Sequence, residues 1–109
     1  MIFQEHIATP YRLIVDFCQR YYITKLSLFG SVLRDDFRAD SDIDVLVEFD
    51  PEHIPGWEFV SMQDELSELF GRQVDLHTYG SLSRHFRDKV GANAQVVYER
   101  SKEIHRINI

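Results

Sequence analysis

The chain has 109 residues, of which 44% are hydrophobic and 28% are charged. These values are typical of one compact domain, here 1–109, and exclude a disordered chain. The formal net charge of −6 argues against a protein that holds nucleic acid by neutralising phosphates, but a small nucleotide is compatible with it. No stretch approaches the roughly 18 apolar residues that span a bilayer, and the N-terminus lacks a signal-peptide pattern, so we expect a cytoplasmic protein without a membrane partner.

The first predicted element is a helix at about 9 to 22. Thr9 can cap this helix, and Pro10 suits its first position. Apolar residues then recur at helical spacing at Leu13, Ile14, Phe17 and Tyr21. A short strand follows at 25 to 29, where polar and apolar residues alternate, and it ends at Gly30.

A second strand is predicted at about 42 to 49, because Asp42 and Asp44 open an apolar, β-branched run. A second long helix follows a surface loop and ends at Gly71. Its apolar positions are Phe59, Met62, Leu66, Leu69 and Phe70. A third strand at 73 to 77 alternates again between apolar and polar residues.

The last part of the chain has weaker patterns. Ser81 is expected to cap a helix in which apolar residues recur every fourth position. Val96, Val97 and Tyr98 are compatible with a short strand or with a turn. The segment 101–109 is expected to be a mobile end or a docking segment. Together these helices and strands predict an α/β (α+β) domain.

Asp42 and Asp44 are the residues that indicate chemistry most directly. Strand side chains alternate, so these two carboxylates project from the same side, with Cα atoms roughly 6.6 Å apart. Like charges at the mouth of a strand resist desolvation, and a divalent cation is the usual compensation. Oxygen ligands favour magnesium. The alternative is a strand entrance in which Asp42 caps a turn and Asp44 pairs with an arginine.

Further residues complete the parts that metal-assisted phosphoryl or nucleotidyl transfer needs. Gly30 and Ser31 begin a turn that can hold a triphosphate, and Arg34 lies between this turn and the carboxylates. Asp75 is predicted to help hold a second metal ion and to accept the proton of the attacking hydroxyl. The alternatives are an ordinary turn, an ion pair of Arg34 with a nearby aspartate, and an outward aspartate on an edge strand. His77 shares a face with Asp75 and is predicted to be packed or solvent-facing.

The motif GS, followed after ten residues by DID at 42–44, resembles the signature of the DNA polymerase β-like nucleotidyltransferase superfamily. The fuller string GSVLRDDFRADSDIDVLVEF is similar to its minimal, MNT-type members, which are encoded beside HEPN-domain toxins in prokaryotes. The resemblance covers nearly the whole chain and includes VDL at 74–76. It implies a polymerase β-like fold, with a small mixed sheet of three or more strands flanked by helices.

The resemblance also implies residue roles and a partner. Gly30 and Ser31 would bind the nucleoside triphosphate, and Arg34 matches an arginine that is common in this motif. The expected magnesium ligands are Asp42, Asp44 and Asp75. Members of this kind act as antitoxins, and some use ATP to place AMP on a tyrosine of the partner toxin, an RNase. The implied function is therefore a magnesium-dependent protein adenylyltransferase with ATP as donor and a HEPN-type toxin as acceptor and complex partner.

Two other functions stay open from the sequence. The chain could be a binding antitoxin that occludes the toxin without catalysis, or it could transfer a nucleotide to a small molecule such as an aminoglycoside. We expect no room for a small-molecule substrate domain in 109 residues, which argues against the second function. The chain departs from the family pattern at Ala39, His77 and Asn93, and none of these is one of the carboxylates.

Overall fold

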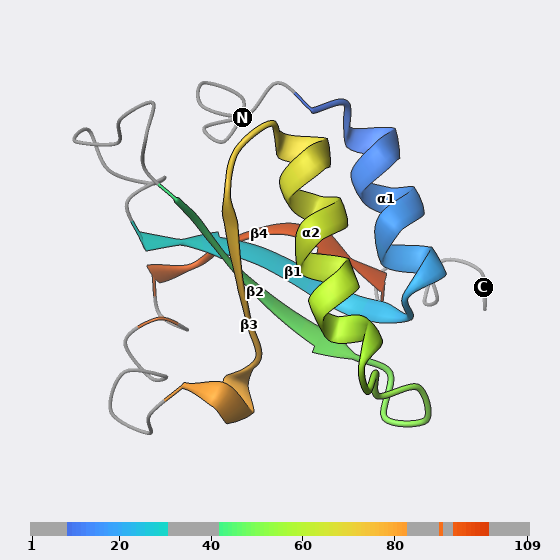
Figure 1. Ribbon diagram of the computed structural model, residues 1–109. Helices are drawn as coiled ribbons and strands as arrows, with labels where there is room; N and C mark the ends of the chain where they lie inside the picture. Colours follow the sequence, from blue (N-terminus) through green and yellow to red (C-terminus); the bar gives the residue numbers. More distant parts are fainter. Residues whose placement is uncertain (1–8, 31–41, 83–89, 91–92, 101–109) are drawn as a thin grey trace, which may run out of the picture.

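Figure 1 shows the computed structural model of the chain, which describes residues 9–30, 42–82, 90 and 93–100. The elements in chain order are α1 (Tyr11–Arg20), β1 (Ile23–Phe29), β2 (Ile43–Phe49), α2 (Glu58–Phe70), β3 (Val74–His77), the 3₁₀ helix η3 (Tyr79–Ser81) and β4 (Gln95–Glu99). The strands form one sheet, and α1 and α2 lie side by side over one of its faces (Figure 1). None of the helices in these ranges is long and apolar enough to cross a membrane.

The sheet is mixed and has the strand order β3-β2-β1-β4. β1 pairs antiparallel with β2 and with β4, whereas β2 pairs parallel with β3. A parallel pair needs a crossover connection, and α2 lies between β2 and β3 in the chain. The predicted α/β class with a small mixed sheet flanked by helices is confirmed, and the ambiguous segment near Val97 is a strand, β4.

Alternation along the strands places most apolar residues on the face beneath the helices, and a smaller apolar cluster of Phe29, Leu46 and Val90 is separate from this main core. The main core consists of Ile14, Phe17, Cys18, Ile23, Leu26, Leu28, Ile43, Val45, Val47, Met62, Leu66, Phe70, Val74, Leu76, Val97 and Tyr98. On α2 the core residues recur every four positions, so one stripe of the helix covers the sheet. Residues between the core positions of β2 and β3 point to the opposite side, which we call the carboxylate face.

α1 begins at Tyr11 rather than at Thr9. Pro10 occupies the N-cap position, and no side chain caps the helix. The Thr9 hydroxyl instead donates a hydrogen bond to the Leu69 carbonyl, 2.5 Å away. The predicted capping role of Thr9 is wrong, because a tertiary hydrogen bond to the end of α2 uses its hydroxyl.

β1 begins at Ile23, two residues earlier than predicted. Tyr22 has a left-handed backbone with φ of 59°, so the chain turns sharply after α1 and enters the strand at once. The end of α2 follows the prediction. Gly71 has φ of 73°, and its N–H donates to the Ser67 carbonyl, which is a common way to end a helix.

Ser81 does not cap a helix that starts at Leu82. Residues 79–81 form η3, and Leu82 has an extended backbone. The Ser81 hydroxyl donates to the Thr78 carbonyl and accepts from the Thr78 N–H, so it closes a local turn instead. The remainder of that prediction, at 83–89, and the tail at 101–109 lie outside the described residues.

A polar cluster joins the exposed sides of the two helices. Arg20 donates to Glu65 and, at 2.9 Å, to Asp16 Oδ2. The Tyr21 hydroxyl donates to Glu65 Oε1 at 2.7 Å. The hydrogen bond from Arg20 is the largest of the effects that hold the pKa of Glu65 below its usual value, and it outweighs the opposing effect of burial. Ionised Glu65 therefore stabilises the folded chain.

Replacing Leu66 with Ala should remove buried contacts between α2 and the sheet and lower the free energy of unfolding by about 2–5 kcal/mol. Asp64→Ala, at an exposed position of the same helix, is the matched control and should change it by no more than about 0.5 kcal/mol. Urea unfolding followed by circular dichroism measures both values. Equal stabilities of the two variants would contradict the assigned core.

The Glu65→Gln variant should be less stable than wild type at pH 7. The pKa of Glu65 is lower in the folded chain than its usual 4.5, so its contribution is complete above pH 4.5 and is lost as the pH falls through the folded pKa. The difference in unfolding free energy between wild type and variant should therefore shrink on acidification. Denaturant titrations from pH 7 to pH 3 test this, and a pH-independent difference would show that the ionised carboxylate contributes nothing.

Candidate active site

The register between β2 and β3 brings two aspartates side by side. Asp44 is paired with Asp75 across the parallel strands, whose backbones in a sheet lie about 4.8 Å apart. The residues before and after each aspartate are in the main core beneath the helices. Both carboxylates therefore lie on the carboxylate face, at neighbouring positions.

α2 sets the position of Asp75 through the backbone of β3. The Val74 N–H donates to Ser67 Oγ, and the Leu76 N–H donates to Gln63 Oε1, each at 3.0 Å. β3 is an edge strand, so these hydrogen bonds satisfy two of its outward N–H groups. Gln63 and Ser67 were not predicted as part of the site, since their spacing of four in the sequence shows only that they share a helix face.

The carboxylates affect one another electrostatically. Burial is the largest cause that raises the pKa of Asp44 above its usual value, and the charges of Asp75 and Asp42 raise it further. His77 opposes these effects without cancelling them. Carboxylate oxygens are hard donors, so a divalent cation such as magnesium fits this set. Within the described ranges no three His, Cys, Asp or Glu side chains are close enough to hold one ion, so a shared metal site stays a prediction.

Gly30 leaves room for the Asp44 carboxylate. Gly30 has φ of 78°, and a Cβ at this position would clash with Asp44 Oδ2 and lie 3.3 Å from its Cγ. The sequence analysis expected this glycine to let the backbone approach a ligand. The described contact is with a side chain of the chain itself, and the close approach to a phosphate stays a prediction.

His77 also lies at the site. Its Nε2 is 3.7 Å from Asp44 Oδ1. The centroid of its ring lies 5.4 Å from the ring centroid of Phe29. The signal for this contact was present in the sequence, because His77 follows Asp75 by two positions on a strand and so shares its face. What the sequence lacked was the neighbouring strand that carries Asp44.

The described residues include only part of the predicted nucleotide site. Ser31 and Arg34 lie outside them, in the gap between Gly30 and Asp42. The structure brings Gly30 and Asp75 to Asp44, and it leaves Asp42 exposed just before β2.

Residues 11–103 match the family model of the nucleotidyltransferase domain. The chain belongs to this family. The enzyme class that the GS and DID motifs predicted is thereby confirmed. The match begins with α1 and continues past β4, so it contains every helix and strand described above.

Curated relatives of this nucleotidyltransferase are named for one activity. An inferred protein adenylyltransferase of Methanocaldococcus jannaschii is 34% identical over 79 residues, which cover 72% of this chain and 84% of that protein. Protein adenylyltransferase MntA of Thermococcus cleftensis is 37% identical over 65 residues, which cover 59% and 64% of the two chains.

Solved structures share the fold. An inferred minimal nucleotidyltransferase has a TM-score of 0.65 at 28% identity, and the match covers 77% of this chain and 85% of that one. A toxin-antitoxin structure with AMP-PNP has a TM-score of 0.62 at 18% identity, with coverages of 90% and 86%. The complex of a tri-AMPylated Shewanella oneidensis HEPN toxin with an MNT antitoxin has a TM-score of 0.57 at 18% identity, with coverages of 87% and 74%. The resemblance to minimal nucleotidyltransferases is confirmed.

Gly30→Ala should destabilise the nucleotidyltransferase by about 1–3 kcal/mol, because the new methyl group meets Asp44 and the left-handed backbone is strained for alanine. Gly56→Ala is the matched control, since a Cβ at Gly56 meets nothing within 4 Å. Thermal unfolding of both variants measures the effect. If Gly30→Ala unfolds at the wild-type temperature, the close approach of Gly30 to Asp44 is wrong.

Proposed function

We propose that this nucleotidyltransferase is an antitoxin that transfers AMP from ATP to a tyrosine of a HEPN-type RNase toxin in a magnesium-dependent reaction. The observation that carries the proposal is the pairing of Asp44 with Asp75 on the carboxylate face. The names of the relatives support AMP transfer to a protein. The tri-AMPylated HEPN toxin found with an MNT antitoxin supports the acceptor, and the structure with AMP-PNP supports an ATP-like donor.

The site residues have separate binding roles in this proposal. Gly30 and Ser31 hold the triphosphate through backbone amides and a hydroxyl, and Arg34 pairs with its charge. Magnesium would be held by Asp42, Asp44 and Asp75, whose side chains would have to come closer together than they are in the described structure to share one ion. When bound, the ion supplies positive charge opposite the phosphate oxygens. The raised pKa of Asp44 supports this assignment, because burial and the charges of Asp75 and Asp42 raise it, and a bound cation offsets both effects.

Asp75 also acts as the base in the proposed transfer. It accepts the proton of the tyrosine hydroxyl as the hydroxyl oxygen attacks the α-phosphorus of ATP. An ester bond forms between that oxygen and phosphorus, the bond from phosphorus to the bridging oxygen breaks, and pyrophosphate leaves. No residue of this chain is modified, so positioning and charge stabilisation account for the rate.

The toxin is both the acceptor and the complex partner. The formal net charge of −6 suits a basic, RNA-cleaving protein through charge complementarity. The single-domain organisation, the cytoplasmic location and the lack of a membrane or nucleic-acid partner stay predictions from the sequence.

Asp44→Asn and Asp75→Asn should each lower AMP transfer at least about 100-fold, because each removes a charge from the reacting centre. The assay follows label from α-³²P-labelled ATP into a HEPN-type toxin that is mixed with this chain. Asp64→Asn, at an exposed position of α2, is the matched control and should transfer AMP like wild type.

Neutralisation of the toxin separates this proposal from its alternatives. The chain is a binding antitoxin, and the catalytic proposal is wrong, if two results are found together. Both Asn variants neutralise the toxin as well as wild type does, and neither wild type nor the variants transfer labelled AMP to the toxin. Labelling of an aminoglycoside in the absence of toxin would favour the small-molecule alternative.

A further inference from the structure

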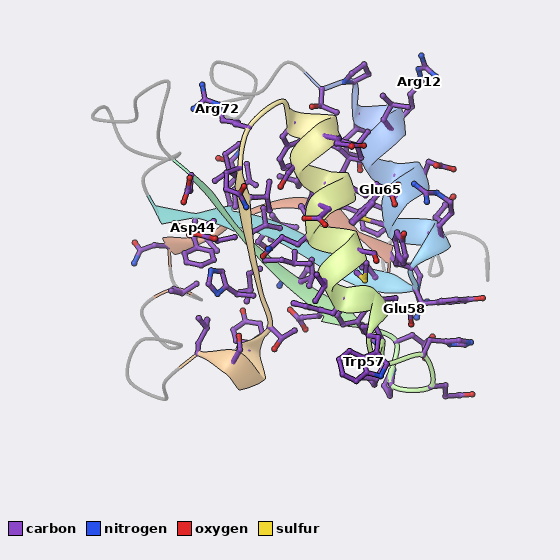
Figure 2. All side chains as sticks on the ribbon, in the orientation of Figure 1. Arg12, Asp44, Trp57, Glu58, Glu65 and Arg72 are labelled. Carbon is purple, nitrogen blue, oxygen red and sulfur yellow. The ribbon has the colours of Figure 1, made fainter. Side chains whose placement is uncertain are left out.

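Large apolar side chains are exposed where the loop after β2 enters α2. Trp57 is 96% exposed, Ile54 is 66% exposed and Val60 is 62% exposed. Tyr22, at the end of α1, is 47% exposed, and its ring stacks on that of His53 at 3.8 Å. We call Tyr22, Ile54, Trp57 and Val60 the Trp57 surface. Figure 2 shows Trp57 extending away from the body of the molecule.

Two hollows adjoin the Trp57 surface. The smaller hollow, of about 280 Å³, has Tyr22, Ile54 and Pro55 in its lining. The larger hollow, of about 400 Å³, has Phe49, Ile54 and Pro55 in its lining. Ile54 and Pro55 line both, so they form a ridge between two places that can receive side chains of a partner. A ridge between two hollows can be complementary in shape to the surface of a partner protein.

The segment around the Trp57 surface carries one sign of charge. Between positions 48 and 68 the sequence contains no lysine or arginine. Its acidic residues are Glu48, Asp50, Glu52, Glu58, Asp64, Glu65 and Glu68. Asp50 and Glu65 pair with arginines from elsewhere in the chain, while Glu52 and Glu58 are exposed on either side of Trp57. An apolar centre with an acidic rim is complementary to a partner with apolar side chains and a basic rim.

We propose that the Trp57 surface is the docking site for the basic HEPN-type toxin. This inference rests on the proposed function, because a partner that cleaves RNA is expected to carry a basic surface. A tryptophan that is almost fully exposed offers a large apolar area to a partner, and tryptophans dominate the binding energy of many interfaces.

The docking site is separate from the candidate active site. Asp44 lies near the start of β2 and Phe49 at its end, and five residues of strand span about 16 Å. Figure 2 labels Asp44 and Trp57 on different sides of the molecule. The acceptor tyrosine must therefore lie on a part of the toxin that reaches at least this far from the docked surface.

Trp57→Ser tests the docking site without weakening the fold. Trp57 is 96% exposed and makes no capping hydrogen bond at the start of α2, so its side chain contributes little to the stability of the fold. The variant should keep the unfolding temperature of wild type and should bind a HEPN-type toxin at least about tenfold more weakly. Ile54→Ser should weaken binding in the same direction. Isothermal titration calorimetry measures both.

Tyr11→Ser is the matched control, because Tyr11 is 46% exposed at the start of α1, the end remote from Tyr22. Its affinity for the toxin should equal that of wild type. If both Trp57→Ser and Ile54→Ser bind the toxin with the affinity of wild type, the proposed docking site is wrong, but the proposed function is unaffected. If wild type itself does not bind the toxin, both the docking site and the proposed function are wrong. If wild type is a dimer and the Trp57→Ser variant is a monomer, the proposed docking site for the toxin is also wrong, because the Trp57 surface would then bind a second copy of the chain.

Discussion

The parallel pairing of β2 with β3 is the contact on which the candidate active site depends. It sets Asp44 beside Asp75, although 31 positions separate them in the sequence. The crossover through α2 makes the pairing possible, and the hydrogen bonds from β3 to Gln63 and Ser67 hold the edge strand in register. A shift of one residue would turn Asp75 toward the core and bring an apolar residue to the carboxylate face.

The two faces of the sheet have opposite effects on the stability of the folded chain. The face under α1 and α2 is apolar and supplies most of the stability, since its residues are almost completely buried. On the carboxylate face, burial and the charges of Asp75 and Asp42 raise the pKa of Asp44, so its ionised side chain opposes folding at neutral pH. Gly30 contributes to this crowding because it lets the Asp44 carboxylate approach the backbone. Burial on one face offsets electrostatic strain on the other, as is common at functional sites.

β2 also links the two surfaces that the proposals use. Its first residues lie by the carboxylates, and its last residue, Phe49, lines the larger hollow beside the Trp57 surface. A strand held on both sides, by β1 and β3, is a rigid spacer. Docking at one end can therefore set the distance from the partner to the reacting groups at the other end, which is how binding energy can serve orientation.

The sequence by itself determined the local structure and the chemical character of the chain. Apolar periodicity located α1, β1, β2 and β3 to within about two residues, because side-chain direction follows from backbone geometry, but it left β4 ambiguous. The GS and DID motifs identified the family, which the match over 11–103 confirms. The roles predicted for the site residues, Gly30, Ser31, Arg34, Asp42, Asp44 and Asp75, remain part of the proposal.

Only the tertiary structure decided which residues meet. Alternation tells which side chains share a face of a strand, but it does not tell which strands are neighbours or in which direction they run. The contacts of His77 and Gly30 with Asp44, and of Thr9 with Leu69, all join residues distant in the sequence. The exposure of Trp57 belongs to the same class, because a hydrophobic residue in a sequence is expected to be buried until the fold leaves it without a neighbour to cover it.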